Sequence, residues 1–178
     1  VACAGNFKDA GLEYTGALKV LQMIFSYEYL WIQIRVKGGA YGCMCSFSDQ
    51  GDSMFVTYRD PNLSESYKVY DEAADYVADF DADDRDMKKY IIGTIGSMDM
   101  PMEAVDMGAR SFHAYFLGKT EADLQKVRDQ VLSCTQEDIR ALAPIVKAVV
   151  EAGNRCCIGN EEKIDQNKEY FDEVKHVL

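Results

Sequence analysis

The sequence predicts an α+β fold, in which a small antiparallel sheet packs against a layer of several helices. Two neighbouring segments alternate along their length and are joined by a short polar turn, which is typical of a β-hairpin. Much of the remaining chain repeats apolar residues at helical spacing. A short strand-like segment near each end completes the predicted sheet. Because helices and strands are segregated, a doubly wound parallel fold is not expected.

The first third of the chain is predicted to hold one strand and one long helix. The opening segment VACAGNF has the pattern of a short first strand. Residues 11–35 then carry apolar side chains at helical spacing, and aromatic residues from Tyr27 to Trp31 predict a bend or a second short helix inside this span. Gly38 and Gly39 are expected to end the helix.

A β-hairpin is predicted next. Residues 41–48 form one strand, the sequence DQGD forms a four-residue turn, and residues 53–59 form the partner strand. Alternation places one set of side chains on a common face of the first strand and another on a common face of the second. The two sets are Tyr41, Cys43, Cys45 and Phe47, and Met54, Val56 and Tyr58.

Two helices are predicted between residues 62 and 98. Asn62 is expected to cap the first, with Glu65 three residues later, and Asp83 and Asp86 to open the second. Gly93 and Gly96 weaken the second helix unless another backbone packs close to it. The predicted buried positions are Tyr67, Tyr70, Ala74 and Val77 in the first helix and Met87, Tyr90, Ile91, Ile95 and Met98 in the second.

The last third is mostly helical. Pro101 is expected as the first residue of a helix that ends at Gly118. Thr120 and Thr135 are predicted caps, each with an aspartate three residues later, and Pro144 should kink or restart the second of these helices. The end of the chain contains a short buried strand at RCCIGN and a last helix capped by Asn160, with Ile164, Phe171 and Val174 as its apolar residues.

Composition limits the class of protein. The chain has 178 residues, 48% hydrophobic and 28% charged, which is typical of a single globular domain over residues 1–178. A net charge of −11 argues against a nucleic-acid partner. No apolar run is long enough to predict a membrane span, and the opening residues do not resemble a signal peptide. Val1 is expected to lie where a longer chain was cut or processed.

The cysteines predict free thiols in a reducing, intracellular environment. Adjacent or alternating cysteines are poor frameworks for local disulfides, and the C-x-C spacing differs from the C-x₂₋₄-C pairs of zinc sites. Small buried thiols are therefore the favoured interpretation. The six positions are Cys3, Cys43, Cys45, Cys134, Cys156 and Cys157.

Catalytic metal binding is not predicted for this chain. Its two histidines belong to neither H-E-x-x-H nor H-x-x-E-H. His113 lies on an apolar helical pattern and is expected in the core or at its boundary, whereas His176 is expected to be solvated. No G-x-S-x-G sequence is present, so a Ser–His or Cys–His nucleophile is not favoured either.

The stretch RVKGGAYG, residues 35–42, allows more than one interpretation. A phosphate loop is excluded because the order of residues is wrong and because the glycines follow a helix, whereas phosphate loops precede one. A helix stop explains Arg35, Lys37 and the two glycines. It does not explain Tyr41 at the start of a strand. The pattern alone favours the helix stop over a functional placement of Arg35 and Tyr41.

Four segments together resemble the zinc metallopeptidases of the insulinase/pitrilysin superfamily, in its presequence-protease or falcilysin-like branch. They are NFKDAGLEYTGALKVL, YLWIQIRVKGGAYG, YRDPNL and DMKKYIIGTI, and the resemblance covers essentially the whole chain. It implies four similar α+β domains in two halves that enclose a chamber, where unfolded peptides are cut. The zinc motif lies in the first domain of such proteins, and this chain resembles the last domain.

The resemblance also implies roles for the opening stretch. Arg35 and Tyr41 are expected to reach across the chamber and contact the peptide beside the zinc, with Gly38, Gly39 and Gly42 positioning the loop. The expected cofactor is zinc, bound by another domain of the parent and not by this chain. The expected partners are peptides and the other domains. The alternative is a non-catalytic structural or peptide-binding module of an inactive family member.

The isolated chain is expected to be inactive and to bind no zinc. It is also expected to self-associate through apolar surface that faces a sister domain in the parent. The parent is expected in the cytoplasm of a bacterium or in an organelle matrix of a eukaryote.

Overall fold

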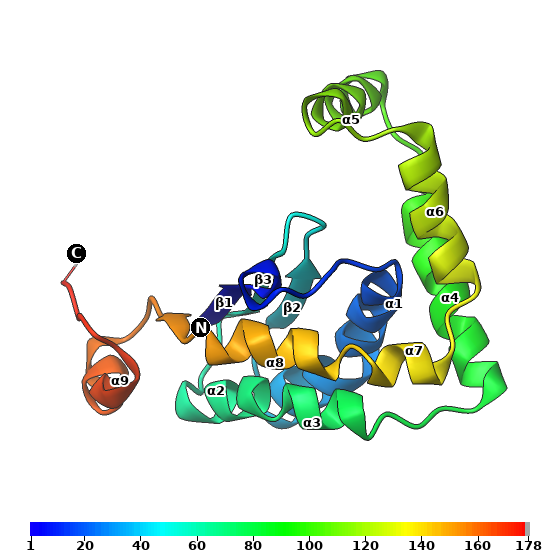
Figure 1. Cartoon of the computed structure of the whole chain (residues 1–178). Helices are drawn as coiled ribbons and strands as arrows, with labels where there is room; N and C mark the ends of the chain where they lie inside the picture. The colour runs from blue at the N-terminus through cyan, green and yellow to red at the C-terminus, as the bar shows by residue number, and fades with distance from the viewer. Residues whose placement is uncertain (177–178) are drawn as a thin grey trace.

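A four-stranded antiparallel sheet forms the centre of the fold in the computed structural model, which describes residues 1–176 (Figure 1). The strand order is β2-β3-β1-β4. This arrangement confirms the predicted α+β class and all four predicted strands. The strands are β1 (Ala2–Asn6), β2 (Gly42–Phe47), β3 (Asp52–Tyr58) and β4 (Asn154–Cys156).

Strand pairing brings the N-terminal strand β1 beside β4, near the other end of the chain. In the predicted hairpin, Gly42 pairs with Tyr58 and Phe47 with Ser53. β1 lies between β3 and β4, so that Cys3 pairs with Phe55 on one side and with Arg155 on the other. The prediction that the segment RCCIGN is a buried strand was wrong in one respect. Among the described residues, β4 is a short strand at the edge of the sheet, and its Cys156 is exposed.

The first long helix starts later than predicted. A 3₁₀ turn at Phe7–Ala10 ends at Gly11, whose φ of +74° breaks the helical path, and α1 (Ala17–Ile24) begins only after a loop. The predicted bend is not a second short α-helix. Instead, two π-helical segments, Phe25–Tyr29 and Trp31–Lys37, continue α1 up to the glycines. Widened turns of this kind are rare and frequently lie at functional sites.

The first of the next two predicted helices is divided, whereas the second agrees with its prediction. The first divides into α2 (Ser64–Asp71) and α3 (Ala73–Ala78), and Asn62 does not cap it, because the Asn62 amide donates to the carbonyl oxygen of Gly38 at 2.6 Å. Asp83 caps α4 (Asp84–Met98) as predicted. The side chain of Met23, rather than another backbone, packs beside Gly93.

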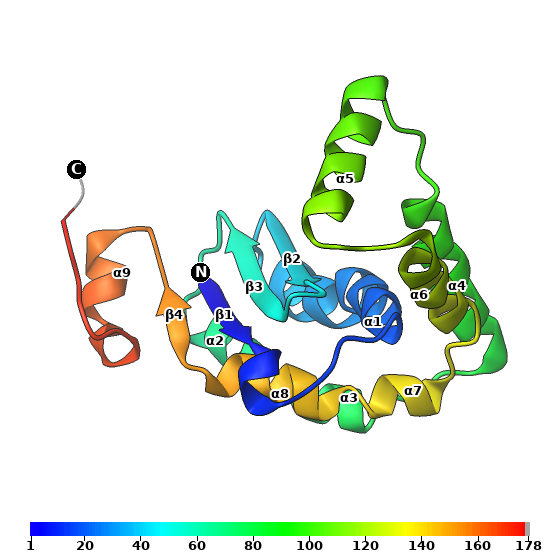
Figure 2. The same cartoon turned by 45° about the horizontal axis from the view of Figure 1, so that its top comes forward.

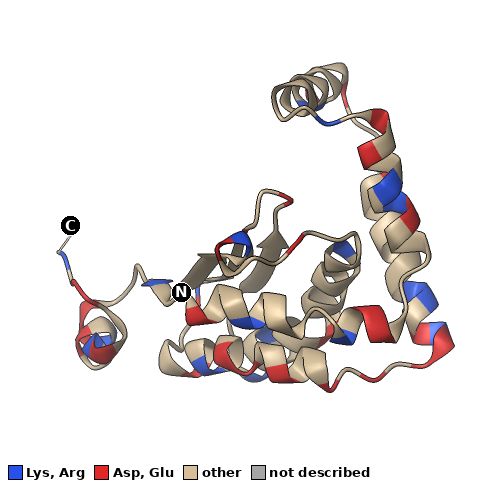
Figure 3. Ribbon diagram, viewed as in Figure 1, with Lys and Arg blue, Asp and Glu red and all other residues tan. Residues whose placement is uncertain are grey.

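α5 (Ala104–Phe116) is the most exposed helix of the described chain. It starts after Pro101, which lies in a loop, so the prediction of Pro101 as the first helical residue was wrong. Phe112 and Phe116 are 65% and 69% exposed, and His113 is also exposed, contrary to its predicted place in the core or at its boundary. Figure 2 shows α5 at the top of the view, apart from the sheet and above the α4–α6 pair, and Figure 3 shows few charges along it.

The last helices largely follow their predicted caps. Thr120 and Thr135 form capping boxes at α6 (Glu121–Leu132) and α7 (Gln136–Arg140), and Pro144 lies in the first turn of α8 (Ala143–Glu151). Asn160 caps α9 (Glu161–Asp165). α9 is shorter than predicted: Phe171 and Val174 lie beyond it, after a 3₁₀ turn at Lys168–Tyr170. His176 is exposed, as predicted.

The core lies between the sheet and the helices α1, α2, α3 and α8 (Figure 1). Its centre is an aromatic cluster, in which Phe25, Phe47 and Tyr70 each pack within 6.0 Å, centroid to centroid, of Phe55. The other face of the hairpin exposes Met44, Met54 and Tyr58. The sheet therefore has one covered and one open face.

Three of the predicted small buried thiols are buried, namely Cys3, Cys45 and Cys134, while Cys43 and Cys157 are partly covered. Burial raises the pKa of the Cys134 thiol to about 12. All six cysteines are free thiols within the described residues.

Candidate functional site

Arg35 and Tyr41 lie together at one end of the hairpin. Arg35 is in the last turn of the second π-helical segment, and Tyr41 directly precedes β2. The Nε–H of Arg35 donates to the backbone oxygen of Tyr41 at 3.0 Å. Tyr41 is 65% exposed. Two residues six positions apart thus present a guanidinium and a phenol from a single loop.

The two glycines between them close the helix. The Gly38 N–H donates to the Gln33 oxygen at 3.1 Å, and the Gly39 N–H to the Arg35 oxygen at 3.0 Å. Gly39 has a φ of +79°, which favours glycine. A Cβ at position 38 would lie 2.5 Å from the Ile34 oxygen. The helix-stop interpretation therefore describes this loop correctly.

Gly42 differs from the other two glycines. It is the first residue of β2, and a Cβ there would meet no atom within 4 Å. Its expected part in positioning the loop stays a prediction, without a steric requirement behind it.

The guanidinium of Arg35 stacks on the ring of Trp31. Its Cζ lies 4.0 Å from the centroid of the Trp31 ring, one helical turn earlier, which is a cation–π arrangement. The two terminal guanidinium nitrogens of Arg35 donate no hydrogen bond to any of the described residues. The side chain is thus held by Nε and by stacking, with two N–H₂ groups left to donate elsewhere.

Tyr41 is flanked by two residues that sequence reasoning did not select. Its ring packs edge-on against Tyr58 at 5.8 Å, and the Arg59 guanidinium lies 5.7 Å from the Tyr41 centroid. Arg59 has a φ of +48°, the sole positive φ of a non-glycine residue in the part of the chain that the structure describes. A second cation therefore stands beside the phenol. Only the pairing of the hairpin strands brings these residues together.

The loop after β3 supports the site from behind. Asn62 binds the Gly38 oxygen, and its own backbone N–H is held by the Asp60 carboxylate at 2.9 Å. The other Asp60 oxygen accepts from the Ser66 hydroxyl at 2.6 Å. These bonds connect the start of α2 to the glycine loop. The sequence suggested a helix cap at Asn62, and the same side-chain amide instead braces the candidate site.

The side chains of this chain do not form a cluster of metal ligands within the described residues. Among residues 1–176, no three His, Cys, Asp or Glu side chains gather into a group that could hold a metal ion. The donor set present therefore does not fit a zinc site.

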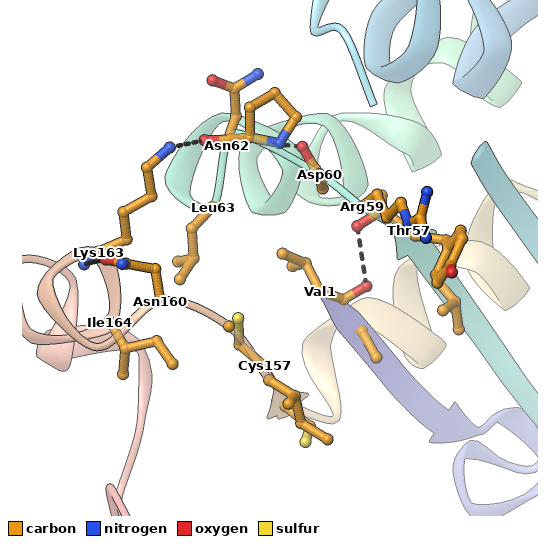
Figure 4. A pocket seen from close by; sticks show the side chains of 17 residues that line it. Val1, Thr57, Arg59, Asp60, Asn62, Leu63, Cys157, Asn160, Lys163 and Ile164 are labelled. Atoms are coloured by element: carbon orange, nitrogen blue, oxygen red, sulfur yellow. Dashed lines mark hydrogen bonds between the residues drawn. The ribbon is translucent and has the colours of Figure 1, made fainter. Parts of the chain in front are cut away.

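Two hollows border the candidate site. One lies between the end of β3 and α9, has a volume of about 550 Å³, and is bordered by Arg59 and Lys163 (Figure 4). The other is a groove of about 650 Å³ between the first long helix and α4, with Trp31 and Cys43 in its wall. Neither hollow is lined by Arg35 or Tyr41 themselves; Trp31 connects Arg35 to the groove, and Arg59 connects Tyr41 to the other hollow.

A family model for the PreP C-terminal domain matches residues 1–160. The chain belongs to the PreP C-terminal domain family. This finding confirms the family that the four sequence segments indicated, and it agrees with a part of a peptidase from the presequence-protease branch.

Relatives of this PreP C-terminal domain are much longer proteins. Protein HypA of Clostridium perfringens is 42% identical over 178 residues, covering all of this chain and 18% of the relative. Presequence protease 1, chloroplastic/mitochondrial, of Arabidopsis thaliana is 34% identical over 182 residues, covering all of this chain and 17% of the relative. A mitochondrial presequence protease of Aspergillus fumigatus is 34% identical over 148 residues. The chain spans less than a fifth of these relatives.

Within residues 1–176, each helix is too short or too polar to cross a membrane.

Proposed function

We propose that this chain is the peptide-contacting C-terminal domain of a zinc-dependent metalloendopeptidase that degrades unfolded peptides in a closed chamber. The observation that carries the proposal is the hydrogen bond that joins Arg35, at the end of a helical segment, to the backbone oxygen of the exposed Tyr41. Membership of the PreP C-terminal domain family supports it, as do the names of the presequence-protease relatives.

The chemistry assigned to the pair is hydrogen-bond donation to a peptide carbonyl. Hydrolysis of an amide moves negative charge onto the carbonyl oxygen, and donors aimed at that oxygen stabilise the charge. The two terminal N–H₂ groups of Arg35 and the phenol O–H of Tyr41 are such donors. Arg35 already stacks on Trp31 and donates from Nε, so its side chain loses little conformational freedom when a peptide binds.

We assign zinc to another domain of the parent, as the family resemblance implies, and no group of three possible ligands is present among the described residues of this chain. When bound, it supplies the activation of the attacking water. The residues of this chain orient and polarise the peptide.

The isolated 178-residue chain is therefore expected to show no peptide hydrolysis, whereas the full-length protein hydrolyses an unfolded peptide and loses this activity with a metal chelator. Turnover of a fluorogenic peptide and metal analysis of both proteins measure this. Zinc at one equivalent in the isolated chain would contradict the assignment.

The alternative function is a structural or peptide-binding module of an inactive parent. A full-length protein without the H-x-x-E-H sequence in its first domain, and without peptide turnover, would favour that alternative over the peptidase.

The proposed partners within the parent are its other domains, and α5 offers a surface for them. Val105, Phe112 and Phe116 are apolar, exposed and spaced seven or four residues apart, so they share one helical face. In the isolated chain this face is expected to cause self-association. Sedimentation velocity should show a concentration-dependent dimer, which Phe112→Glu abolishes and Ile158→Glu, at another exposed apolar residue, leaves in place. A wild-type chain that stays monomeric at every concentration over about a 100-fold range would contradict this expectation.

We expect the full-length protein in the cytoplasm of a bacterium or in an organelle matrix of a eukaryote. No nucleic-acid or membrane partner is proposed.

A further inference from the structure

The groove beside Arg35 follows a regular stripe of side chains. Lys19, Met23, Tyr27, Trp31 and Arg35 are spaced four residues apart; the first four border the groove, and Arg35 stacks on Trp31. In an α-helix, a step of four residues overshoots one turn by about 40°. A π-helical turn holds more residues, so it rotates the stripe back. The π-helical segments therefore keep Arg35 in line with the groove.

The walls of the groove combine aromatic, thioether and hydroxyl groups. Tyr27 and Trp31 form one wall, and Met98, Ser97 and Thr94 of α4 form the opposite wall. The volume of about 650 Å³ exceeds that of one large side chain. Aromatic and methionine side chains contribute most to the binding free energy when they bury another apolar group.

The groove and the candidate site share residues at their junction. Trp31 lies in the groove wall and beneath the Arg35 guanidinium. Cys43 also borders the groove, and Arg35 is close enough to offset part of the rise that burial causes in the pKa of the Cys43 thiol. A peptide whose carbonyl accepts from Arg35 therefore has a side chain within reach of the groove.

The far end of the groove is cationic. Lys19 has no carboxylate within 4.0 Å among the described residues. Burial lowers the pKa of Lys19, Asp49 opposes this shift, and Arg110 and Lys119 add to it. The nearby Asp49 is already paired with Lys119. A second cation brought into this end would be repelled.

We propose that this groove is a specificity subsite, which binds a large apolar side chain of the peptide held by Arg35 and Tyr41 and rejects a lysine or arginine side chain. The inference rests on the proposed function, and it adds the class of side chain that the site selects. Tyr27 and Met98 supply the apolar contact, and Lys19 supplies the repulsion.

The test uses the full-length protein and peptides that carry a single Phe, Ala or Lys at successive positions of an otherwise small and polar sequence. Wild-type kcat/KM is expected to favour Phe over Ala at one position. Tyr27→Ala and Met98→Ala should each lower that Phe/Ala ratio about tenfold. Lys19→Met should raise the Lys/Phe ratio about tenfold at the same position.

Two matched controls locate the effect. Ile92→Ala removes an exposed apolar side chain from α4 outside the groove, and Ile158→Ala does so at the other hollow. Both should keep the wild-type Phe/Ala ratio. A ratio that falls only with Ile158→Ala, or that stays within twofold in both groove variants, overturns the subsite assignment.

Binding separates this outcome from a failure of the proposed function. Fluorescence anisotropy of labelled Phe and Ala peptides on chelator-treated full-length protein should show the same dependence on Tyr27 and Met98. Loss of the binding preference in these variants supports the subsite even if Tyr41→Phe leaves turnover unchanged, which would refute only the role of Tyr41. A binding ratio unaltered in the groove variants, with turnover lost in Tyr41→Phe, refutes only the subsite.

Discussion

Replacement of Arg35 by alanine in the full-length protein is expected to lower kcat/KM for peptide hydrolysis by about 100- to 1000-fold, the usual effect of removing a donor to a developing oxyanion. Tyr41→Phe, which removes only the phenol O–H, is expected to lower it by about 100-fold. Arg35→Lys should rescue little, because an ammonium group cannot both stack on Trp31 and donate to the Tyr41 oxygen as the planar guanidinium does. Steady-state kinetics with a fluorogenic peptide measures these changes.

The matched control is Lys37→Ala, two residues after Arg35 in the same turn. Lys37 is exposed and donates to the Gln33 side chain at 3.1 Å, so its loss should change turnover less than twofold. Zinc content and thermal unfolding should equal those of the wild type in all four proteins. Near-wild-type turnover in Arg35→Ala and Tyr41→Phe together would remove the pair from the proposed site.

Replacement of Phe55 by alanine is expected to destabilise the chain by about 3–5 kcal/mol, because it leaves a cavity in the aromatic cluster. Phe55 is 0% exposed, and its ring lies 5.7 Å from Phe25, 6.0 Å from Phe47 and 5.4 Å from Tyr70. For a chain of this length, the melting temperature should fall by about 10 °C. Urea unfolding followed by far-UV circular dichroism gives the free energy directly.

The control for Phe55 is its neighbour in β3. Met54 points to the open face of the sheet and is 45% exposed, so Met54→Ala should cost less than about 1 kcal/mol. Equal losses in the two variants would mean that the open face of the sheet is covered in solution, contrary to the arrangement of this chain.

Much of the fold could be predicted because its causes are local. Alternation of side chains located the hairpin, and Thr120, Thr135 and Asp83 located three helix starts, since a cap and its N–H partner are three residues apart. Predictions failed where a distant residue competed for a local group. Asn62 is the example: its amide serves the Gly38 oxygen, 24 residues away, in place of a helix N-terminus.

For the candidate site, the sequence by itself determined the loop. Glycines after a helix that ends in basic residues must close that helix, so the spacing of Arg35 and Tyr41 and their common loop follow from local chemistry. The family resemblance then gave these residues an expected role, which stays a prediction.

Only the tertiary structure decided what surrounds them. Arg59 reaches Tyr41 because β2 and β3 pair, and the groove beyond Trp31 exists because α4 packs across the first long helix. Likewise, the apolar pattern of α5 predicted a helix but not that its apolar face would be exposed. Periodicity reports which side chains share a face, whereas contacts between segments far apart in the chain determine what that face meets.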